Sequence, residues 1–347
     1  MRFGNSDQGS LDLPLIIAEL SGNHNGSIDR MLRMVDEAAT VGVDAIKIQT
    51  YTADTITLNI STEDFVIQDS NSPWFGRRLY ELYQEAHTPW EWHEAIFNRA
   101  REVGVPCFST PFDETAVEFL EQFNPPVYKI SSFENTHYPL IKKLVDTGRP
   151  LLISTGLATK SELVELVGFL RKYSCEDFVL LKCTSAYPAH AADCNLQTMV
   201  DMQDSFNCEV GLSDHTLGVG ISVAAAALGA VVIEKHFTLD RQDGGPDASF
   251  SLEPHEFRLL IDEVRRASHG IGKVKYGPTE AELPSMRFRR SIYVSEDVKK
   301  GEKFSTKNLA IVRPSYGLPP IEYSRVVGRR AQKDLKRGDR LNWSDVM

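Results

Sequence analysis

The stretch "CEVGLSDHTLG", residues 208–218, decides how the main body of the chain folds. Val210 and Leu212 occupy alternate positions, as the apolar residues of a short buried strand do. The polar triplet "SDH", residues 213–215, follows at once, before a glycine turns the chain away. An apolar strand that ends in polar side chains is typical of a strand whose C-terminal end opens on a site.

Similar apolar runs recur along the main body and alternate with amphipathic segments. We predict eight strands, at residues 15–19, 45–49, 105–109, 127–130, 151–154, 178–183, 209–212 and 231–234. Eight strand–helix alternations over about 270 residues match a (β/α)₈ TIM barrel in number and size. An open doubly wound sheet is the alternative, but no G-x-G-x-x-G motif follows the first strand. We therefore predict an α/β fold built on a barrel.

Helix boundaries between these strands carry capping residues. Ser27 precedes "IDRMLRMVDEAATVG", which stops at Gly42, and Thr159 stands three residues before Glu162, as in a capping box. The segment "TPWE", residues 88–91, places a hydroxyl at an expected N-cap and proline at the first helical position. We predict that a helix begins there.

The chain is long enough for more than one domain. Its 347 residues are 42% hydrophobic and 25% charged, which is a soluble globular balance. The segment "GIGKVKYGPTEAELPS" is punctuated by glycine and proline and indicates a linker. We predict a catalytic barrel at residues 1–270, a linker at 271–286 and a small β-rich module at 287–347.

The C-terminal module contains an internal repeat. "DVKKGEKFSTKNL", residues 297–309, aligns without gaps with "DLKRGDRLNWSDV", residues 334–346. The simplest interpretation is two equivalent strand–turn–strand corners of a small β module. A second unusual segment, residues 50–87, is far longer than the usual connection between a strand and a helix of a barrel, and we expect it to act as a lid.

Charge is unevenly distributed along the chain, and this distribution bears on whether the protein binds nucleic acid. Residues 287–347 hold 15 lysines and arginines against 7 acidic residues, a net charge of +8. Because the whole chain carries −10, the preceding residues carry −18. An acidic main body repels nucleic acid, and no nucleic-acid recognition motif accompanies the basic residues. We therefore expect no nucleic-acid partner.

The sequence also indicates a cytoplasmic protein. No apolar run is long enough to cross a membrane, and residues 11–20 are too short and too acidic for a signal peptide. The five cysteines are odd in number and lack the close pairs of a metal knuckle, so we expect reduced thiols.

The ends of the predicted strands locate the chemistry, because catalytic groups of a barrel project from the C-terminal ends of its strands. Polar residues stand at or just after every predicted strand end: Glu19, Lys47, Gln49, Thr110, Lys129, Ser132, Ser154, Lys182, Ser185, Ser213, Asp214, His215, Glu234 and His236. We expect these side chains to meet at one rim.

The two histidines follow the last two strands, which are neighbours in a closed barrel. A single histidine at a strand end is usually structural, but His215 and His236 each stand beside an acidic residue. This arrangement predicts a divalent metal site with imidazole ligands and with Asp214 or Glu234 as their hydrogen-bond partners. Two histidines with water and substrate oxygens suit Mn²⁺, Mg²⁺ or a similar cation in an open site.

Three lysines are expected to converge with hydroxyl groups on the same rim. Lysines in a buried position need anionic partners, and hydroxyl donors beside them suit a phosphate and a carboxylate. The residues concerned are Lys47, Lys129 and Lys182 with Thr110, Ser132, Ser154 and Ser213. The alternative is that each lysine pairs with a structural carboxylate, such as Glu19 or Glu234.

At these same positions the chain resembles a known family. The motifs, in order, are "IIAELSGNHNGS", "IKIQTYTADT", "YKISSFE", "ISTGLAT", "LKCTSAYP", "GLSDHT", "IEKHFTLDR" and "GGPDASFSL". Together they resemble the sialic acid synthase family, whose members condense phosphoenolpyruvate with an N-acylated amino-sugar aldehyde. The C-terminal module resembles the antifreeze-like (SAF) domain of that family. "KIQTYTADT" and "GRRLYELYQEAHTPWEWH" look most like the branch of the family that makes pseudaminic acid, rather than N-acetylneuraminate or legionaminate.

The resemblance implies a role for each matching residue. His215 and His236 would bind the metal. Phosphoenolpyruvate would lie on Lys47, Thr110, Lys129, Ser132, Ser154, Ser185 and Ser213. Gln49, Tyr187 and Asp247 would lie toward the sugar.

The resemblance also implies a domain-swapped homodimer. Arg313, in "RPSYGLPP", matches the arginine that the family's C-terminal domain inserts into the partner's active site. One residue departs from the pattern, because some members carry a glutamate in the "NH-x-G" motif where this chain has Asn25. Asn25, Glu19 and Glu234 are then the candidates for acid–base catalysis.

Two other functions fit parts of the sequence. A Schiff-base aldolase would use Lys129 or Lys182 as a desolvated nucleophile and would need no metal. A non-catalytic carbohydrate-binding protein would use the C-terminal module alone. The complete polar rim favours the condensation, because a pure binding protein has no need of paired histidines and three lysines at strand ends.

Overall fold

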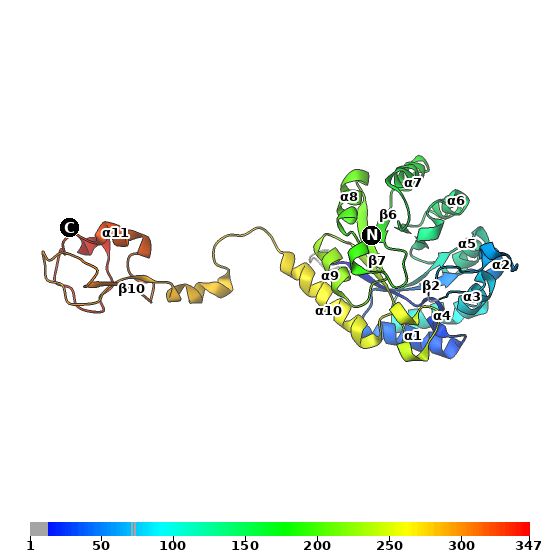
Figure 1. Cartoon of the computed structure of the whole chain (residues 1–347), viewed down its shortest axis with the longest axis horizontal. Helices are drawn as coiled ribbons and strands as arrows, with labels where there is room; N and C mark the ends of the chain where they lie inside the picture. Colours follow the sequence, from blue (N-terminus) through cyan, green and yellow to red (C-terminus); the bar gives the residue numbers. More distant parts are fainter. Residues whose placement is uncertain (1–12, 71, 73) are drawn as a thin grey trace. The chain divides into compact units, whose positions relative to one another are not determined.

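The computed structural model describes residues 13–70, 72 and 74–347, which form two compact units (Figure 1). The first unit ends at Gly272 and the second begins at Lys273. Residues 1–12, which the predicted barrel segment includes, lie outside the described residues. Within the described part of the chain, no helix combines the length and apolar character needed to cross a membrane.

The first unit is a closed barrel of eight parallel strands in sequence order (Figure 1), which confirms the predicted fold. The strands are β1 (Leu15–Glu19), β2 (Ala45–Thr50), β3 (Cys107–Pro111), β4 (Tyr128–Ile130), β5 (Leu151–Ser154), β6 (Phe178–Cys183), β7 (Glu209–Asp214) and β8 (Val232–His236). β8 pairs with β1 to close the barrel, with His236 opposite Glu19. β7 and β8 extend beyond the predicted ends, so part of the polar rim belongs to the strands themselves.

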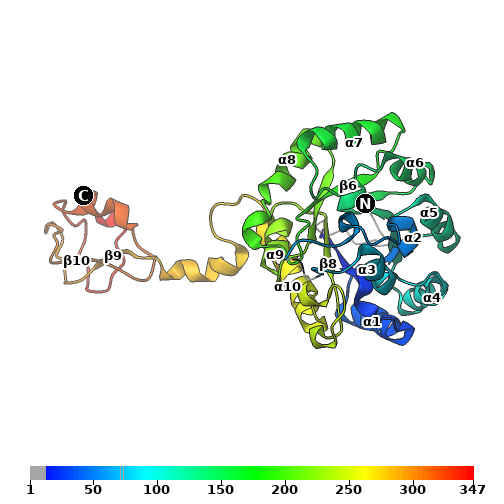
Figure 2. The ribbon, with the colours of Figure 1, turned by 45° about the vertical axis from the view of Figure 1, so that its right-hand side comes forward.

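Helices surround the barrel (Figure 2). They are α1 (Ile28–Val41), α2 (Ala53–Ile56), α3 (Leu79–Ala86), α4 (His93–Val103), α5 (Glu114–Leu120), α6 (Tyr138–Asp146), α7 (Lys160–Lys172), α8 (Gln197–Phe206), α9 (Gly220–Ala227) and α10 (Pro254–Ile271). α2 and α3 lie within the long insertion after β2, and α10 packs against α1 and α9.

Two of the three predicted helix starts are confirmed. The Ser27 side chain accepts from the Arg30 backbone N–H at 3.3 Å, and Thr159 and Glu162 form the capping box of α7. The predicted start at Thr88 is wrong. Pro89 is extended, with ψ of 134°, so the chain first makes a short 3₁₀ turn and α4 begins only at His93.

Strand alternation divides the core into two layers. Residues that point into the barrel form its inner core: Ile17, Ala45, Phe108, Val127, Leu152, Val179, Leu181 and Val232. The residues between them pack outward against the helices. Since successive side chains of a strand point to opposite faces, this parity also decides which polar residues of a strand reach the mouth of the barrel.

The second unit has its own small core and an antiparallel pair of strands, β9 (Ser291–Val294) and β10 (Leu309–Val312). Its helical element α11 spans Tyr323–Val326. The two copies of the repeat pair reciprocally, because Lys299 lies 3.3 Å from Asp334 and Lys336 lies 2.8 Å from Asp297. The repeat therefore encodes two equivalent halves that hold each other.

A buried histidine makes the stability of the barrel dependent on pH. His93 donates from Nδ1–H to the Pro89 carbonyl at 3.2 Å, and its Nε2 accepts from the Thr50 hydroxyl at 2.7 Å. Burial lowers the pKa of His93 to about 4, so the ring is neutral near pH 7 and its Nε2 is an acceptor.

We predict that His93→Gln flattens the pH dependence of unfolding. Between pH 6.5 and pH 4, His93 is protonated in the unfolded chain but stays neutral in the folded protein. The free energy of unfolding therefore decreases by about 1.4 kcal/mol for each pH unit that the pH falls. Urea denaturation at pH 7 and pH 5 measures the difference. His255→Gln is the matched control because its ring is exposed. Equal pH dependence in wild type and His93→Gln would contradict the assignment.

Candidate active site

A cavity of about 600 Å³ opens at the C-terminal ends of the strands. Its walls come from the strand ends, the lid insertion after β2 and the loop between β8 and α10. Of the predicted site residues, these line it: Lys47, Gln49, Thr110, Lys129, Ser132, Ser154, Ser185, Tyr187, Ser213, His215, Glu234, His236 and Asp247. Eleven of these side chains belong to the predicted rim, whereas Tyr187 and Asp247 are the residues that the family resemblance placed toward the sugar.

The two histidines face the cavity side by side, with ring centroids 5.3 Å apart. His215 Nδ1–H donates to the Thr184 carbonyl at 3.0 Å, which leaves its Nε2 free for another partner. His236 Nδ1 has no hydrogen-bond partner among the described residues and lies 3.8 Å from a carboxylate oxygen of Asp247. Burial, followed by nearby cations, lowers the pKa of His236 well below its ordinary value, so its lone pair is available.

These donors fit a divalent cation in an open site. Imidazole nitrogens bind Mn²⁺, Fe²⁺ and Zn²⁺, and a catalytic centre keeps positions for water and substrate. Among the described residues no group of three or more histidine, cysteine or acidic side chains is arranged to hold a metal. His215 and His236 would therefore bind a cation together with oxygens of water or substrate.

Lys47 on β2 occupies the centre of a buried charge cluster. Its Nζ contacts the Glu19 carboxylate, lies 3.5 Å from Glu234 and donates to Thr110 Oγ1 at 3.0 Å. Burial raises the pKa of Glu19 to about 7, against the opposing effect of Lys47. Burial acts on Glu234 in the same direction, but Lys47 and Lys129 hold the pKa of Glu234 below its ordinary value.

Lys129 on β4 has a different environment. Its Nζ donates to Ser154 Oγ at 2.6 Å and to the Ile130 carbonyl at 2.9 Å, and it forms no ion pair within the described residues. Burial lowers the pKa of Lys129. Lys47 thus forms ion pairs with carboxylates of the protein. The ammonium group of Lys129 forms none among the described residues, so it could pair with an anion that enters the cavity.

Serine hydroxyls surround the position beside Lys129. Ser132 Oγ accepts from the Gly156 backbone N–H at 3.1 Å, and a Cβ at Gly156 would lie only 2.2 Å from Ser185 Oγ. Only glycine at position 156 lets the hydroxyls of Ser132 and Ser185 approach the backbone this closely. Together with Ser154 they present hydroxyl donors on one wall, which suits a phosphate or carboxylate.

Lys182 does not reach the cavity. On β6, Leu181 belongs to the inner core and Cys183 lines the cavity, so Lys182 between them points to the helix layer. Its Nζ donates to the Cys183 carbonyl at 2.9 Å and to Thr184. The expected convergence of three lysines is therefore reduced to two.

Asp214 and Asn25 also lie elsewhere than expected. Asp214 alternates out of the barrel, where its carboxylate accepts from Lys235 Nζ at 2.8 Å and from Ser222, so it is not a partner of either histidine. Asn25 donates to the carbonyls of Asp243 and Gly244 at 3.2 and 3.0 Å and does not line the cavity. This geometry gives Asn25 a structural contact with a loop.

Glu19 and Arg313 complete the predicted set. Glu19 is fully buried beneath Lys47 and acts on the cavity through that lysine. Arg313 belongs to the second unit, where its side chain is exposed.

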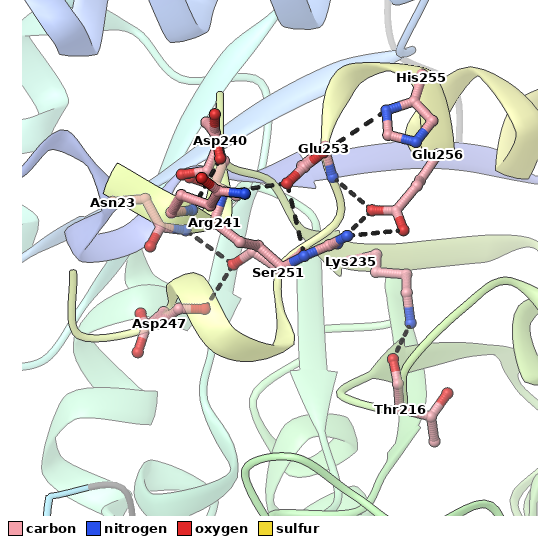
Figure 3. Close-up of polar contacts among 12 residues, drawn as sticks. Asn23, Thr216, Lys235, Asp240, Arg241, Asp247, Ser251, Glu253, His255 and Glu256 are labelled. Atoms are coloured by element: carbon pink, nitrogen blue, oxygen red, sulfur yellow. Dashed lines mark hydrogen bonds and ion pairs between the residues drawn. The ribbon is translucent and has the colours of Figure 1, made fainter. Parts of the chain in front are cut away.

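The loop between β8 and α10 that carries Asp247 is held by polar contacts (Figure 3). Asn23 Nδ2 donates to Ser251 Oγ at 2.8 Å, and Ser251 Oγ donates to the Asp247 carbonyl at 2.7 Å. Arg241 donates to the Ser251 carbonyl and to Glu256, both at 3.1 Å, and so fastens the loop to the start of α10. Asp247 is thus fixed from the side of the barrel.

Several cavity residues were not singled out from the sequence. Glu134 and Cys183 stand inside the quoted motifs "SSFE" and "LKCTSAYP", so the strand-end rule could have found them. The lid adds an apolar wall, formed by Ile56, Ile67, Leu79 and Leu82. Ile56 belongs to α2, and Leu79 and Leu82 belong to α3. Which of their faces points inward depends on how these short helices lie at the mouth, and no local pattern of residues encodes that.

The fold and the site define a class of protein: a (β/α)₈ barrel with an anion-binding wall and a histidine pair at its mouth, followed by a small β module. The model of the NeuB family matches residues 34–276, and that of the SAF domain matches residues 289–347. The chain belongs to the NeuB family, and its second unit is a SAF domain.

Individual relatives match almost the whole chain. Pseudaminic acid synthase of Campylobacter jejuni is 46% identical and covers 95% of this chain and 96% of its own length. N,N'-diacetyllegionaminic acid synthase of Legionella pneumophila is 36% identical over 99% of this chain and 97% of its own. The crystal structure of N-acetylneuraminic acid synthetase from Leptospira borgpetersenii, with 31% identity, superimposes with a TM-score of 0.69 over 80% of this chain and 92% of its own.

Two buried lysines provide a matched test of the anion site. Lys47→Met and Lys235→Met each leave a buried carboxylate unpaired, so we expect both to lower the free energy of unfolding by about 3–5 kcal/mol. Only Lys47→Met should also weaken phosphoenolpyruvate binding, because Lys235 lies outside the cavity. Lys129→Met breaks no ion pair and should weaken binding with a smaller loss of stability. Urea denaturation and calorimetric titration measure the two effects, and unchanged binding in both cavity variants would contradict the assignment.

Proposed function

We propose that this protein is a pseudaminic acid synthase. It condenses phosphoenolpyruvate with 2,4-diacetamido-2,4,6-trideoxy-L-altrose and water, and it releases a nine-carbon 2-keto sugar acid and phosphate. The observation that carries the proposal is the division of one cavity into a cationic, hydroxyl-rich wall and an apolar lid. The 46% identity to the Campylobacter enzyme over nearly the whole chain, against 36% to the legionaminic acid synthase, supports the choice of sugar.

Phosphoenolpyruvate occupies the polar wall. Lys129 and the hydroxyls of Ser132, Ser154 and Ser185 hold its anionic groups, and Lys47, Thr110 and Ser213 lie across the floor. Charge-assisted hydrogen bonds from an ammonium group and several hydroxyls are strong and directional. They fix carbon 3 of phosphoenolpyruvate toward the space between the histidines and the lid.

His215 and His236 would hold a divalent cation, of which Mn²⁺ is one candidate. A cation bound there supplies a Lewis acid for the sugar aldehyde. The histidines themselves contribute orientation, because the Thr184 carbonyl fixes the tautomer and direction of His215.

The charged and hydroxyl side chains of the cavity carry out proton transfer and stabilise the departing phosphate. When carbon 3 attacks the aldehyde, positive charge develops at carbon 2, and water adds there before the C–O bond to phosphate breaks. Glu234 lines the cavity and its pKa is held low, so it is ionised and can accept a proton from that water. Lys129 and the serine hydroxyls stabilise the departing phosphate.

The second unit completes the site in a domain-swapped homodimer. Phe133, Leu157 and Leu217 follow β4, β5 and β7 and are 59%, 73% and 63% exposed, so three loops of the rim carry an exposed apolar side chain. Exposed apolar side chains mark a contact surface when they lie together. We assign this rim to the partner's SAF domain, which carries the exposed Arg313.

The five free cysteines support a reducing, cytoplasmic setting.

One observation favours a different chemistry. Burial lowers the pKa of Lys129 and makes its amine more nucleophilic, as in a Schiff-base aldolase. Such an enzyme would be trapped covalently by borohydride with its keto substrate, whereas the synthase would remain unmodified.

We predict that phosphate release requires phosphoenolpyruvate, the sugar and a divalent cation together. Chelation with EDTA abolishes it and Mn²⁺ restores it, because no other group among the described residues supplies a Lewis acid. His215→Ala and His236→Ala should each lower kcat/KM on the order of 100-fold or more. His269→Ala, an exposed histidine on α10, is the control. Turnover that survives chelation would contradict the metal site.

We also predict a strong preference among sugars. Kinetics with the diacetamido-altrose, its diacetamido-mannose analogue and N-acetylmannosamine should rank the altrose first. The apolar wall of the lid favours both 6-deoxy diacetamido sugars over N-acetylmannosamine, and the higher identity to the pseudaminic acid synthase than to the legionaminic acid synthase favours the altrose over its mannose analogue. Buried apolar contacts of one methyl group discriminate about 10- to 200-fold. Equal kcat/KM on all three sugars would contradict the assignment to pseudaminic acid.

A further inference from the structure

The lid insertion after β2 contains a short hairpin ahead of α3, and Ile67 and Trp74 of this hairpin line the cavity. The Gly76 N–H donates to the Ile67 carbonyl at 2.8 Å, and the Ile67 N–H donates to the Arg77 carbonyl at 3.0 Å. Gly76 has a φ of +76°, which a glycine adopts without strain. Trp74 lies in the turn of this hairpin, where its own carbonyl accepts from the Arg77 N–H at 3.1 Å.

Trp74 joins the lid to the opposite side of the cavity. Its indole Nε1–H donates to the Pro246 carbonyl at 3.0 Å, across 172 residues of sequence. Its ring centroid lies 5.6 Å from that of Tyr187. Trp74, Tyr187 and Pro246 all line the cavity. One side chain of the lid therefore touches the loop between β8 and α10 at the residue that precedes Asp247.

That loop is held from two sides. On the barrel side, Ser251 donates to the Asp247 carbonyl, and Asn23 and Arg241 fix Ser251 (Figure 3). On the cavity side, Trp74 holds the Pro246 carbonyl. The Asp247 carboxylate projects between these two anchors toward Ser21 and lies 3.8 Å from His236 Nδ1. The position of the carboxylate relative to the histidine therefore depends on these two anchors together with the hydrogen bond from Ser21 Oγ.

The lid and this loop also offer different chemistry to a ligand. The lid contributes the apolar side chains of Ile56, Ile67, Leu79 and Leu82, whereas the opposite wall contributes the carboxylate of Asp247 and the imidazole of His236. A sugar with methyl groups on one side and hydroxyl groups on the other fits between them. In this conformation the apolar side chains of the lid line the cavity while Trp74 reaches the Pro246 carbonyl.

We propose that Trp74 is a latch that positions Asp247 when the lid closes on the sugar. It couples recognition of the sugar's apolar face to the placement of the carboxylate beside His236. The inference rests on the proposed function for the identity of the sugar. Trp74 acts on the reaction through Asp247 and is a positioning residue.

Trp74→Phe removes the indole N–H and keeps an aromatic ring. We expect the KM for the sugar to rise about 3- to 10-fold, as the loss of one hydrogen bond predicts, while the KM for phosphoenolpyruvate stays within twofold. Trp74→Ala removes the latch altogether and should lower kcat/KM for the sugar on the order of 100-fold. Phe75→Leu is the matched control, because Phe75 is the next residue, is 56% exposed and does not line the cavity.

Hydrogen exchange tests the coupling without turnover. In Trp74→Phe and Trp74→Ala, the lid around residues 65–79 and the loop around residues 244–251 should both exchange faster than in wild type, and neither should change in Phe75→Leu. Unchanged sugar KM in Trp74→Ala, an equal rise in both KM values, or faster exchange confined to the lid would overturn the latch. If the wild type turned over no sugar, the proposed function would fail, and the exchange result would still decide the latch.

Discussion

A closed parallel barrel admits only every second residue of each strand to its interior, and the site of this protein follows from that constraint. On β8, Glu234 and His236 face the cavity, while Lys235 between them faces outward and binds Asp214. The same alternation brings Cys183 to the cavity and turns Lys182 away. Polar residues that are adjacent in sequence therefore serve two separate layers, one for chemistry and one for stability.

Inside the mouth, the same groups stabilise the fold and prepare the site. A buried charge without a partner costs several kcal/mol, so the ammonium group of Lys47 requires Glu19 and Glu234. The two glutamates share the same ordinary pKa, but their surroundings shift it in opposite directions. The pKa of Glu19 rises to about 7, while that of Glu234 falls. Lys129 has no carboxylate partner among the described residues, and an anion bound in the cavity would compensate its charge.

The lid adds what the barrel cannot supply. Strand ends carry polar groups at regular positions around the rim, whereas the apolar wall comes mainly from α2 and α3 of the insertion. The indole of Trp74 joins it to the loop between β8 and α10, because it donates to the Pro246 carbonyl across 172 residues of sequence. We therefore assign specificity for the sugar to this insertion, on a barrel whose strand ends hold the polar groups of the site.

The sequence by itself determined the eight strands, the barrel, the repeat of the second unit and most of the rim, because strand periodicity and strand-end polarity are local properties. Lys47, Lys129 and the histidine pair were found in this way. Only the tertiary structure decided that Lys182 and Asn25 lie outside the cavity, that α4 begins at His93 rather than beside Thr88, and which lid side chains face inward. Those outcomes depend on the direction of each side chain and on distances between remote segments, and neither is encoded in a local pattern of residues.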